Sequence, residues 1–184
     1  MQPTTRVGVR VTFLRMDQRA PARRPLPPDA DLVRLVHCSV PFYRYLYGTV
    51  GAPYVWWLRR SLSDEALARI LANPAVSVHV LYRGGEPAGF FELDASATPF
   101  VNLSYFGLLP QQTGQGLGVA FLDAAVEAAW GEGGRTVTVN TCTADHPRAL
   151  PNYVRAGFHK VRVIDEVWDV PNRLGLSIPQ HLRI

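Results

Sequence analysis

The stretch "LLPQQTGQGLGVAFL", residues 108–122, has glycine at every second position from 114 to 118. It lies between an apolar run with aromatic and branched residues, 100–109, and a run with apolar residues at helical spacing, 117–130. The first run predicts a strand and the second predicts a helix. A glycine turn from a strand into a helix exposes consecutive backbone N–H groups, and the helix dipole adds partial positive charge there. The stretch therefore predicts a site for an anion such as a phosphate.

The spacing of the glycines distinguishes between known phosphate-binding turns. A Walker loop needs a lysine after its last glycine, and this stretch has none. A Rossmann turn needs GxGxxG in the first strand–helix unit, whereas this GxGxG comes after several predicted strands. The pattern QxxGxG, from Gln111 to Gly116, remains. Tight packing of the strand against the helix, with no ligand, is the other explanation of these glycines.

A second stretch, "DHPRALPNYVRAGF" at 145–158, also carries residues at a characteristic spacing. A short predicted helix carries Ala149 and, four residues on, Tyr153, and a Gly-Phe pair at 157–158 opens the next strand. Together with the QxxGxG turn, this stretch resembles the GNAT superfamily of N-acetyltransferases. The resemblance covers residues 76–165 by motif and the chain before them only by the order of elements.

The resemblance implies that acetyl-CoA is the co-substrate and that the turn binds its pyrophosphate through backbone N–H groups. It also implies that the pantetheine arm pairs with the strand before the turn. Family members often carry an asparagine at the position of His146. The implied cofactor-binding residues are Leu108, Gln111, Gln112, Thr113, Gly114, Gln115, Gly116, Leu117, Gly118 and His146.

The resemblance also implies two catalytic roles. Tyr153 stands where the family carries its general acid, which protonates the departing CoA thiolate. Glu92, an acid within the apolar segment "GFFELD", is the candidate general base, and an outward-facing solvated glutamate is the plain alternative. Asp94, Asp145 and His146 are substitutes for that role. Cys142 is interpreted as packing, because no nucleophilic triad accompanies it.

The remaining periodicities predict a mixed α/β domain. Most of its predicted elements alternate between strand and helix patterns. Strands are predicted at 6–16, 100–109, 135–142 and 158–170 and in a hairpin around 84–85; helices are predicted near 30–38, at 63–73, at 117–130 and from 147 to 156, with a loop at 17–31. The family resemblance implies one domain, 1–184, with a mostly antiparallel sheet flanked by helices and a splay between the strands at 100–109 and 135–142.

Composition narrows the class of protein. The 184 residues are 47% hydrophobic and 18% charged, which is typical of a globular domain. No apolar run approaches the roughly 20 residues of a membrane span, so we expect a cytoplasmic protein with no membrane partner. The two cysteines have no metal-ligand spacing, and the basic residues that give the net charge of +4 form no long run. Neither a metal site nor a nucleic-acid partner is expected.

The acceptor is not identified by the sequence. Aromatic residues crowd the segment 40–62, and Trp168 follows in the last strand. This segment is interpreted as an acceptor site, as core or as the surface of a homodimer. The overall hypothesis is transfer of an acetyl group, without a metal, to an amine of a small molecule or peptide. The alternative is a catalytically weak sensor or interaction module that binds CoA or acyl-CoA.

Overall fold

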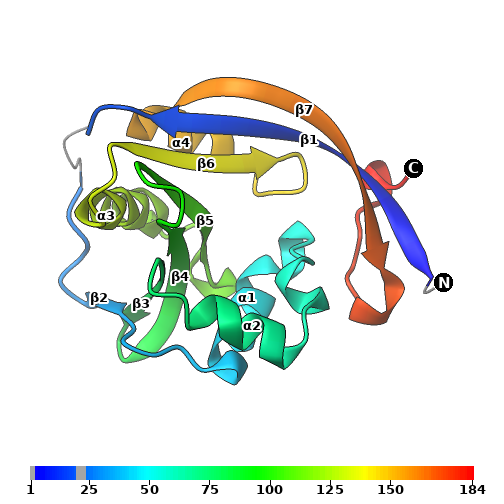
Figure 1. The fold of residues 1–184 in the computed structure, drawn as a ribbon, viewed down its shortest axis with the longest axis horizontal. Coiled ribbons are helices and arrows are strands. Elements are labelled where there is room, and N and C mark those ends of the chain that lie inside the picture. Colours follow the sequence, from blue (N-terminus) through cyan, green and yellow to red (C-terminus); the bar gives the residue numbers. More distant parts are fainter. Residues whose placement is uncertain (1–2, 20–23) are drawn as a thin grey trace.

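Seven strands make up the sheet of the computed structural model, which describes residues 3–19 and 24–184 (Figure 1). The strands are β1 (Thr4–Met16), β2 (Ala30–Arg34), β3 (Val76–Arg83), β4 (Glu86–Asp94), β5 (Phe100–Leu108), β6 (Thr136–Cys142) and β7 (His159–Pro171). Their order across the sheet is β2-β3-β4-β5-β6-β1-β7. Every neighbouring pair is antiparallel except β5 and β6, which are parallel. The predicted fold class, a mixed and mostly antiparallel sheet with helices, is confirmed.

Four α-helices cover the two faces of the sheet (Figure 1). They are α1 (Val40–Gly51), α2 (Asp64–Leu71), α3 (Leu117–Gly131) and α4 (Ala149–Ala156). Because neighbouring side chains of a strand point to opposite faces, β4 packs on two helices at once. Phe90 contacts Tyr43 of α1, with ring centroids 5.9 Å apart, and Phe91 contacts Phe121 of α3 at 5.6 Å. The same alternation turns Glu92 toward α1.

Helix ends follow the predicted signals. Ser63 precedes α2, and its hydroxyl accepts a hydrogen bond from the N–H of Ala66 at 3.2 Å. The acids Asp64 and Glu65 lie in the first turn of α2, where the helix dipole favours negative charge. Gly157 ends α4 with a φ of 106°, a left-handed conformation that favours glycine. Local chemistry therefore marks the start of α2 and the end of α4.

The parallel strands β5 and β6 separate partway along their length. They pair from Phe100 with Thr136 to Leu103 with Val139, and the pairing ends there although both strands continue. This is the predicted splay. Within the described residues, the edge of β5 from Ser104 to Leu108 that faces β6 has no strand partner.

One predicted element is wrong. Residues 30–34, assigned to a helix near 30–38, form strand β2 instead. Leu32 pairs with Leu81 and Val33 with Val80, so β3 supplies the backbone hydrogen bonds that a five-residue segment lacks by itself. Of the predicted loop at 17–31, residues 20–23 lie outside the described residues.

Within residues 3–19 and 24–184, no helix combines the length and the apolar character that crossing a membrane requires. The same residues contain no group of three or more His, Cys, Asp or Glu side chains arranged to hold a metal ion.

Candidate functional site

The glycine turn connects β5 to α3 and leaves backbone N–H groups uncapped. Gly114 and Gly116 have φ values of 78° and 77°, the left-handed region that glycine adopts without strain. Gly116 precedes the first residue of α3, and no side chain caps the helix. A Cβ atom at Gly114 or Gly116 would meet no atom within 4 Å, so the space beside these N–H groups is open. The turn has the geometry of an anion cradle.

The side chains of the turn hold its own shape. Thr113 donates its hydroxyl hydrogen to the carbonyl of Pro110 at 2.8 Å, and the Gln115 amide donates to the carbonyl of Gln111 at 2.8 Å. Arg83 donates to the Gln115 side-chain oxygen at 2.7 Å, which brings a cation beside the turn. The side chain of Leu117 is buried in the core, so only the backbone of this residue is available to a ligand.

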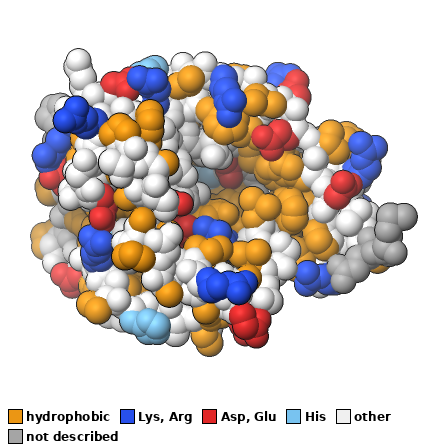
Figure 2. All heavy atoms as spheres, viewed as in Figure 1, with side chains coloured by type: hydrophobic (Ala, Val, Ile, Leu, Met, Phe, Trp, Pro, Cys, Tyr) orange, Lys and Arg blue, Asp and Glu red, His pale blue; other side chains and the backbone are white. Residues whose placement is uncertain are grey.

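A cavity of about 1170 Å³ extends from the turn along the splay. Of the predicted cofactor residues, the cavity wall includes Leu108, Thr113, Gly114, Gly116, Gly118 and His146. Gln111, Gln112, Gln115 and Leu117 do not line it. Hydrophobic side chains gather around the hollow between the β1–β7 strands and the helices below them (Figure 2). The volume exceeds the roughly 300–1,000 Å³ of a pocket for one small molecule, and so leaves room for two reactants.

Tyr153 lines this cavity from α4 and is 6% exposed. Its ring packs edge-on against Phe158 at 5.8 Å and Phe106 at 6.5 Å, which fixes its orientation. Among the described residues none forms a hydrogen bond with the phenol. Burial raises the pKa of Tyr153, and the nearby charge of Asp145 raises it further. The phenol is therefore protonated at neutral pH and available as a proton donor.

Asp145 and His146 follow β6 and lie on the cavity wall. One carboxylate oxygen of Asp145 accepts from the hydroxyl of Thr141 at 2.7 Å and from the N–H of Cys142 at 2.8 Å. The other accepts from the indole N–H of Trp56 at 3.4 Å. His146 accepts from the N–H of Arg148 at 3.1 Å through Nδ1. Two of the three substitutes for the base, Asp145 and His146, thus lie on the cavity wall.

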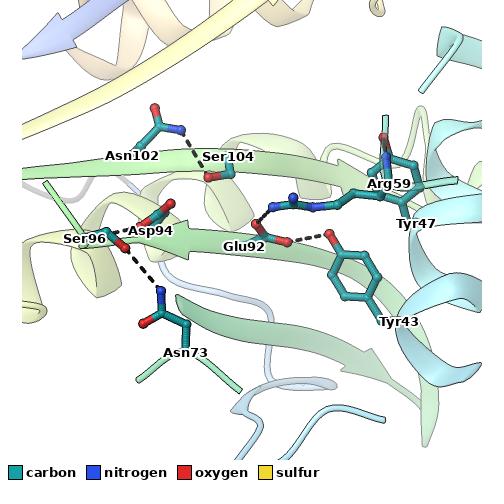
Figure 3. Close-up of polar contacts among 9 residues, drawn as sticks. All are labelled: Tyr43, Tyr47, Arg59, Asn73, Glu92, Asp94, Ser96, Asn102 and Ser104. Carbon is teal, nitrogen blue, oxygen red and sulfur yellow. Dashed lines mark hydrogen bonds and ion pairs between the residues drawn. The ribbon is translucent and has the colours of Figure 1, made fainter. Parts of the chain in front are cut away.

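Glu92 lies away from the cavity wall and is 0% exposed. Its two oxygens accept hydrogen bonds from the hydroxyl of Tyr43 and from the guanidinium of Arg59, the latter at 2.5 Å (Figure 3). Burial has the largest single effect on the pKa of Arg59 and lowers it, but Glu92, Tyr43 and Tyr105 together raise that pKa above its ordinary value. The geometry gives no support to Glu92 as a base. Its visible role is to hold Arg59, which does line the cavity.

Asp94, the last residue of β4, is also absent from the cavity wall among the described residues. Its carboxylate accepts from the N–H of Ser96 at 2.9 Å and stabilises the turn after the strand.

Burial raises the pKa of Cys142 to about 12, with a contribution from Asp145, so this thiol stays neutral.

The aromatic segment 40–62 divides between core and cavity. Tyr43 is fully buried under Phe90, whereas Tyr54, Trp56 and Trp57 face the cavity. Sequence analysis missed Arg59, which follows this aromatic run in a short 3₁₀ turn, Arg59–Ser61. An arginine beside a cluster of tryptophans was the available signal, but its partner Glu92 is distant in sequence.

Comparison with known proteins identifies the family. The sequence model described as "Acetyltransferase (GNAT) family" matches residues 41–158, more than half of the chain. The chain belongs to the GNAT acetyltransferase family. No curated protein matches the sequence at a significant level.

Solved structures with the GNAT fold agree with this assignment. A GCN5-related N-acetyltransferase from Kribbella flavida has a TM-score of 0.62 and 15% identity, over 90% of this chain and 60% of that chain. A GCN5-related N-acetyltransferase from Sphaerobacter thermophilus has a TM-score of 0.64 and 17% identity, over 92% of this chain and 53% of that chain. An aminoglycoside acetyltransferase from an uncultured soil metagenomic sample, in complex with sisomicin, has 0.53 and 17%, over 70% and 87%. The GNAT chain thus spans less than two thirds of the first two proteins, and these identities show the fold alone.

Proposed function

We propose that the protein is an acetyl-CoA-dependent N-acetyltransferase that acetylates an amine of a small molecule or peptide directly. The observation that carries this proposal is the position of Tyr153 on the wall of a cavity that also contains the glycine turn and the free edge of β5. Family membership supports the reaction class.

The residues present fit acetyl-CoA. The open space beside Gly114 and Gly116 suits the pyrophosphate, because a side chain there would occupy it. The N–H groups that begin α3 add the positive end of the helix dipole. The β5 edge from Ser104 to Leu108 offers backbone groups to the amides of the pantetheine arm. Arg148 and Arg155 also line the cavity and supply positive charge for an anionic ligand.

Acetyl-CoA supplies an acetyl group activated as a thioester. Tyr153 donates its phenolic proton to the sulfur as the carbon–sulfur bond breaks, so that the thiol and not the thiolate leaves. The raised pKa makes the phenol of Tyr153 a weaker acid than a free tyrosine, so its proton moves only as negative charge develops on sulfur. The ring contacts of Tyr153 with Phe106 and Phe158 hold the hydroxyl in one orientation during transfer.

The alternative function, a sensor that binds acyl-CoA without turnover, would need only the turn and the β5 edge. A buried, protonated tyrosine without a protein partner for its hydroxyl has no evident purpose in such a sensor. The position of Tyr153 therefore favours the enzyme.

The test is the release of free CoA thiol from acetyl-CoA in the presence of a panel of amines. We expect thiol release that depends on the amine and on its concentration. Thermal stabilisation by acetyl-CoA with no release for any amine would favour the sensor instead.

A further inference from the structure

One carboxylate on the cavity wall, that of Asp145, accepts a hydrogen bond from the aromatic residue Trp56. Its three described hydrogen bonds come from Trp56, Thr141 and the backbone of Cys142, which are all neutral donors. Among the described residues, no Lys, Arg or His forms an ion pair with it. Within the described part of the chain, the carboxylate of Asp145 thus forms no ion pair with a basic side chain.

The charge of Asp145 acts on both ends of this part of the cavity. After burial, it is the next cause that raises the pKa of Tyr54 on one side and of Tyr153 on the other. It also contributes to the raised pKa of Cys142 between them. A cation placed beside Asp145 would thus be near the proposed acid and near the aromatic rings.

The other charged side chains of the cavity wall either contact other side chains of the protein or belong to the α4 region. Arg59 is held by the buried Glu92 at 2.5 Å. Arg148 and Arg155 belong to the start and the end of the α4 region, beside the proposed cofactor site. Glu166, the second acid on the wall, accepts a hydrogen bond from the indole of Trp168 at 2.8 Å. With three arginines and two acids on its described wall, the cavity disfavours an acceptor with several positive charges.

Aromatic rings line part of the cavity and form what we call the aromatic wall. The rings are those of Phe13, Tyr54, Trp56, Trp57, Tyr105 and Trp168. Trp56 packs against Tyr105 at 5.2 Å and Tyr47 at 5.3 Å, so this wall is held in place by the core. Flat rigid rings favour a flat apolar group by stacking, and their faces also attract a cation.

We propose that the acceptor is a primary amine carried by an aromatic group on a short linker, with Asp145 as the residue that binds its ammonium. This inference rests on the proposed acetyltransferase function and specifies the substrate of the same site. The aromatic wall holds the ring of the acceptor, and Asp145 directs the nitrogen toward Tyr153.

The proton transfers follow from this arrangement. Asp145 takes one proton from the ammonium and leaves a neutral amine, whose lone pair forms the bond to the acetyl carbon. The electrons of the broken carbon–sulfur bond go to sulfur, which takes the proton of Tyr153. The new amide nitrogen loses its second proton to solvent, and Asp145 and Tyr153 then return to their starting states by exchange with water.

The test is calorimetric titration of the protein, saturated with CoA, with 2-phenylethylamine and three matched compounds. 2-Phenylethanol lacks the charge, hexylamine lacks the ring, and spermidine has several charges. We expect 2-phenylethylamine to bind at least about tenfold more tightly than each of the others. Equal binding of the amine and the alcohol, or tightest binding of spermidine, would overturn the proposal, and neither result depends on a variant that folds.

A pair of variants adds a second arm. Asp145→Asn keeps an oxygen for Thr141 and Cys142, and we expect it to weaken 2-phenylethylamine about tenfold while acetyl-CoA affinity stays within about twofold. Asp165→Asn removes an equal charge from an exposed ion pair with Arg10, outside the cavity, and should change neither affinity. Unchanged binding of the amine to Asp145→Asn would contradict the role of this residue.

The two levels of the account fail in different ways. If 2-phenylethylamine does not bind but other amines release CoA from acetyl-CoA, only the inference about the acceptor is wrong. If 2-phenylethylamine binds as expected but no amine is acetylated, the acetyltransferase function is wrong and the acceptor site remains.

Discussion

Tyr153 lies on the cavity wall, and its hydroxyl is the group whose pKa is raised. Replacing Tyr153 with Phe keeps the ring contacts with Phe106 and Phe158 but removes the proton. We expect kcat to fall about 100-fold, with the affinity for acetyl-CoA changed little. Steady-state kinetics and calorimetry measure the two effects. An unchanged kcat would remove Tyr153 as the acid.

The ion pair between Glu92 and Arg59 leads to a prediction about the stability of the protein. Glu92→Gln leaves the half-buried guanidinium of Arg59 without its counter-charge, and we expect the free energy of unfolding to fall by about 3 kcal/mol. Tyr43→Phe removes one hydrogen bond but keeps that ion pair, and should cost about 1–2 kcal/mol. Urea denaturation measures both. A Glu92→Gln variant with unchanged stability but lost turnover would instead support Glu92 as the base.

The sequence predicted part of the site because part of it is local. Gly114, Gly116 and Tyr153 belong to short motifs whose spacing is fixed by one turn and one helix. The pairing of Glu92 with Arg59 is not local, since it depends on how the segment after α1 packs against β4. An apolar strand around an acid does not reveal whether the acid faces a cavity or a buried arginine.

At the scale of elements, the turn between β5 and α3 is the decisive one. Gly116→Glu would place a side chain and a negative charge beside the uncapped N–H groups and impose a non-glycine residue on a φ of 77°. We expect at least about a 100-fold loss of acetyl-CoA affinity by calorimetry, because the phosphates would meet that charge.

Gly133→Glu is the matched control for this turn. Gly133 has a φ of 81° and open space around its Cβ position, but it lies after α3 and outside the cavity wall. The Gly133→Glu variant carries the same backbone strain as Gly116→Glu. Because Gly133 lies outside the cavity, its acetyl-CoA affinity should match that of the wild type. Equal losses in the two variants would mean that strain, and not the cradle, explains the effect.

Elements with strong local signals were predicted, and one that depends on a partner was not. The helix that follows Ser63 and the hairpin around Gly84–Gly85 carry their own local signals, and both elements were predicted from sequence. Strand β2 has five residues and no alternating pattern, and its conformation comes from pairing with β3. Such a segment cannot be assigned without knowing its neighbour.

For the whole molecule, a buried histidine couples stability to pH. His79 is 6% exposed and stacks on Phe91 at 4.5 Å, and burial lowers its pKa from 6.5 to about 4. The unfolded chain binds a proton at His79 more readily than the folded chain does. The contribution of His79 to the free energy of unfolding is therefore fully present above about pH 6.5 and is lost as the pH drops toward 4. We expect a loss of about 2 kcal/mol over that range in urea denaturation, and His79→Gln should flatten it. An equally steep pH dependence in His79→Gln would contradict this origin.

The account as a whole claims that the cavity brings an acetyl thioester to an amine. The most direct measurement follows an isotopically labelled acetyl group from acetyl-CoA, by mass spectrometry, in the presence of a primary amine such as 2-phenylethylamine and a wider amine panel. We predict a labelled amide that forms in step with free CoA thiol, and none with Gly116→Glu. Binding of acetyl-CoA to the wild-type protein without label in any amine would contradict the account.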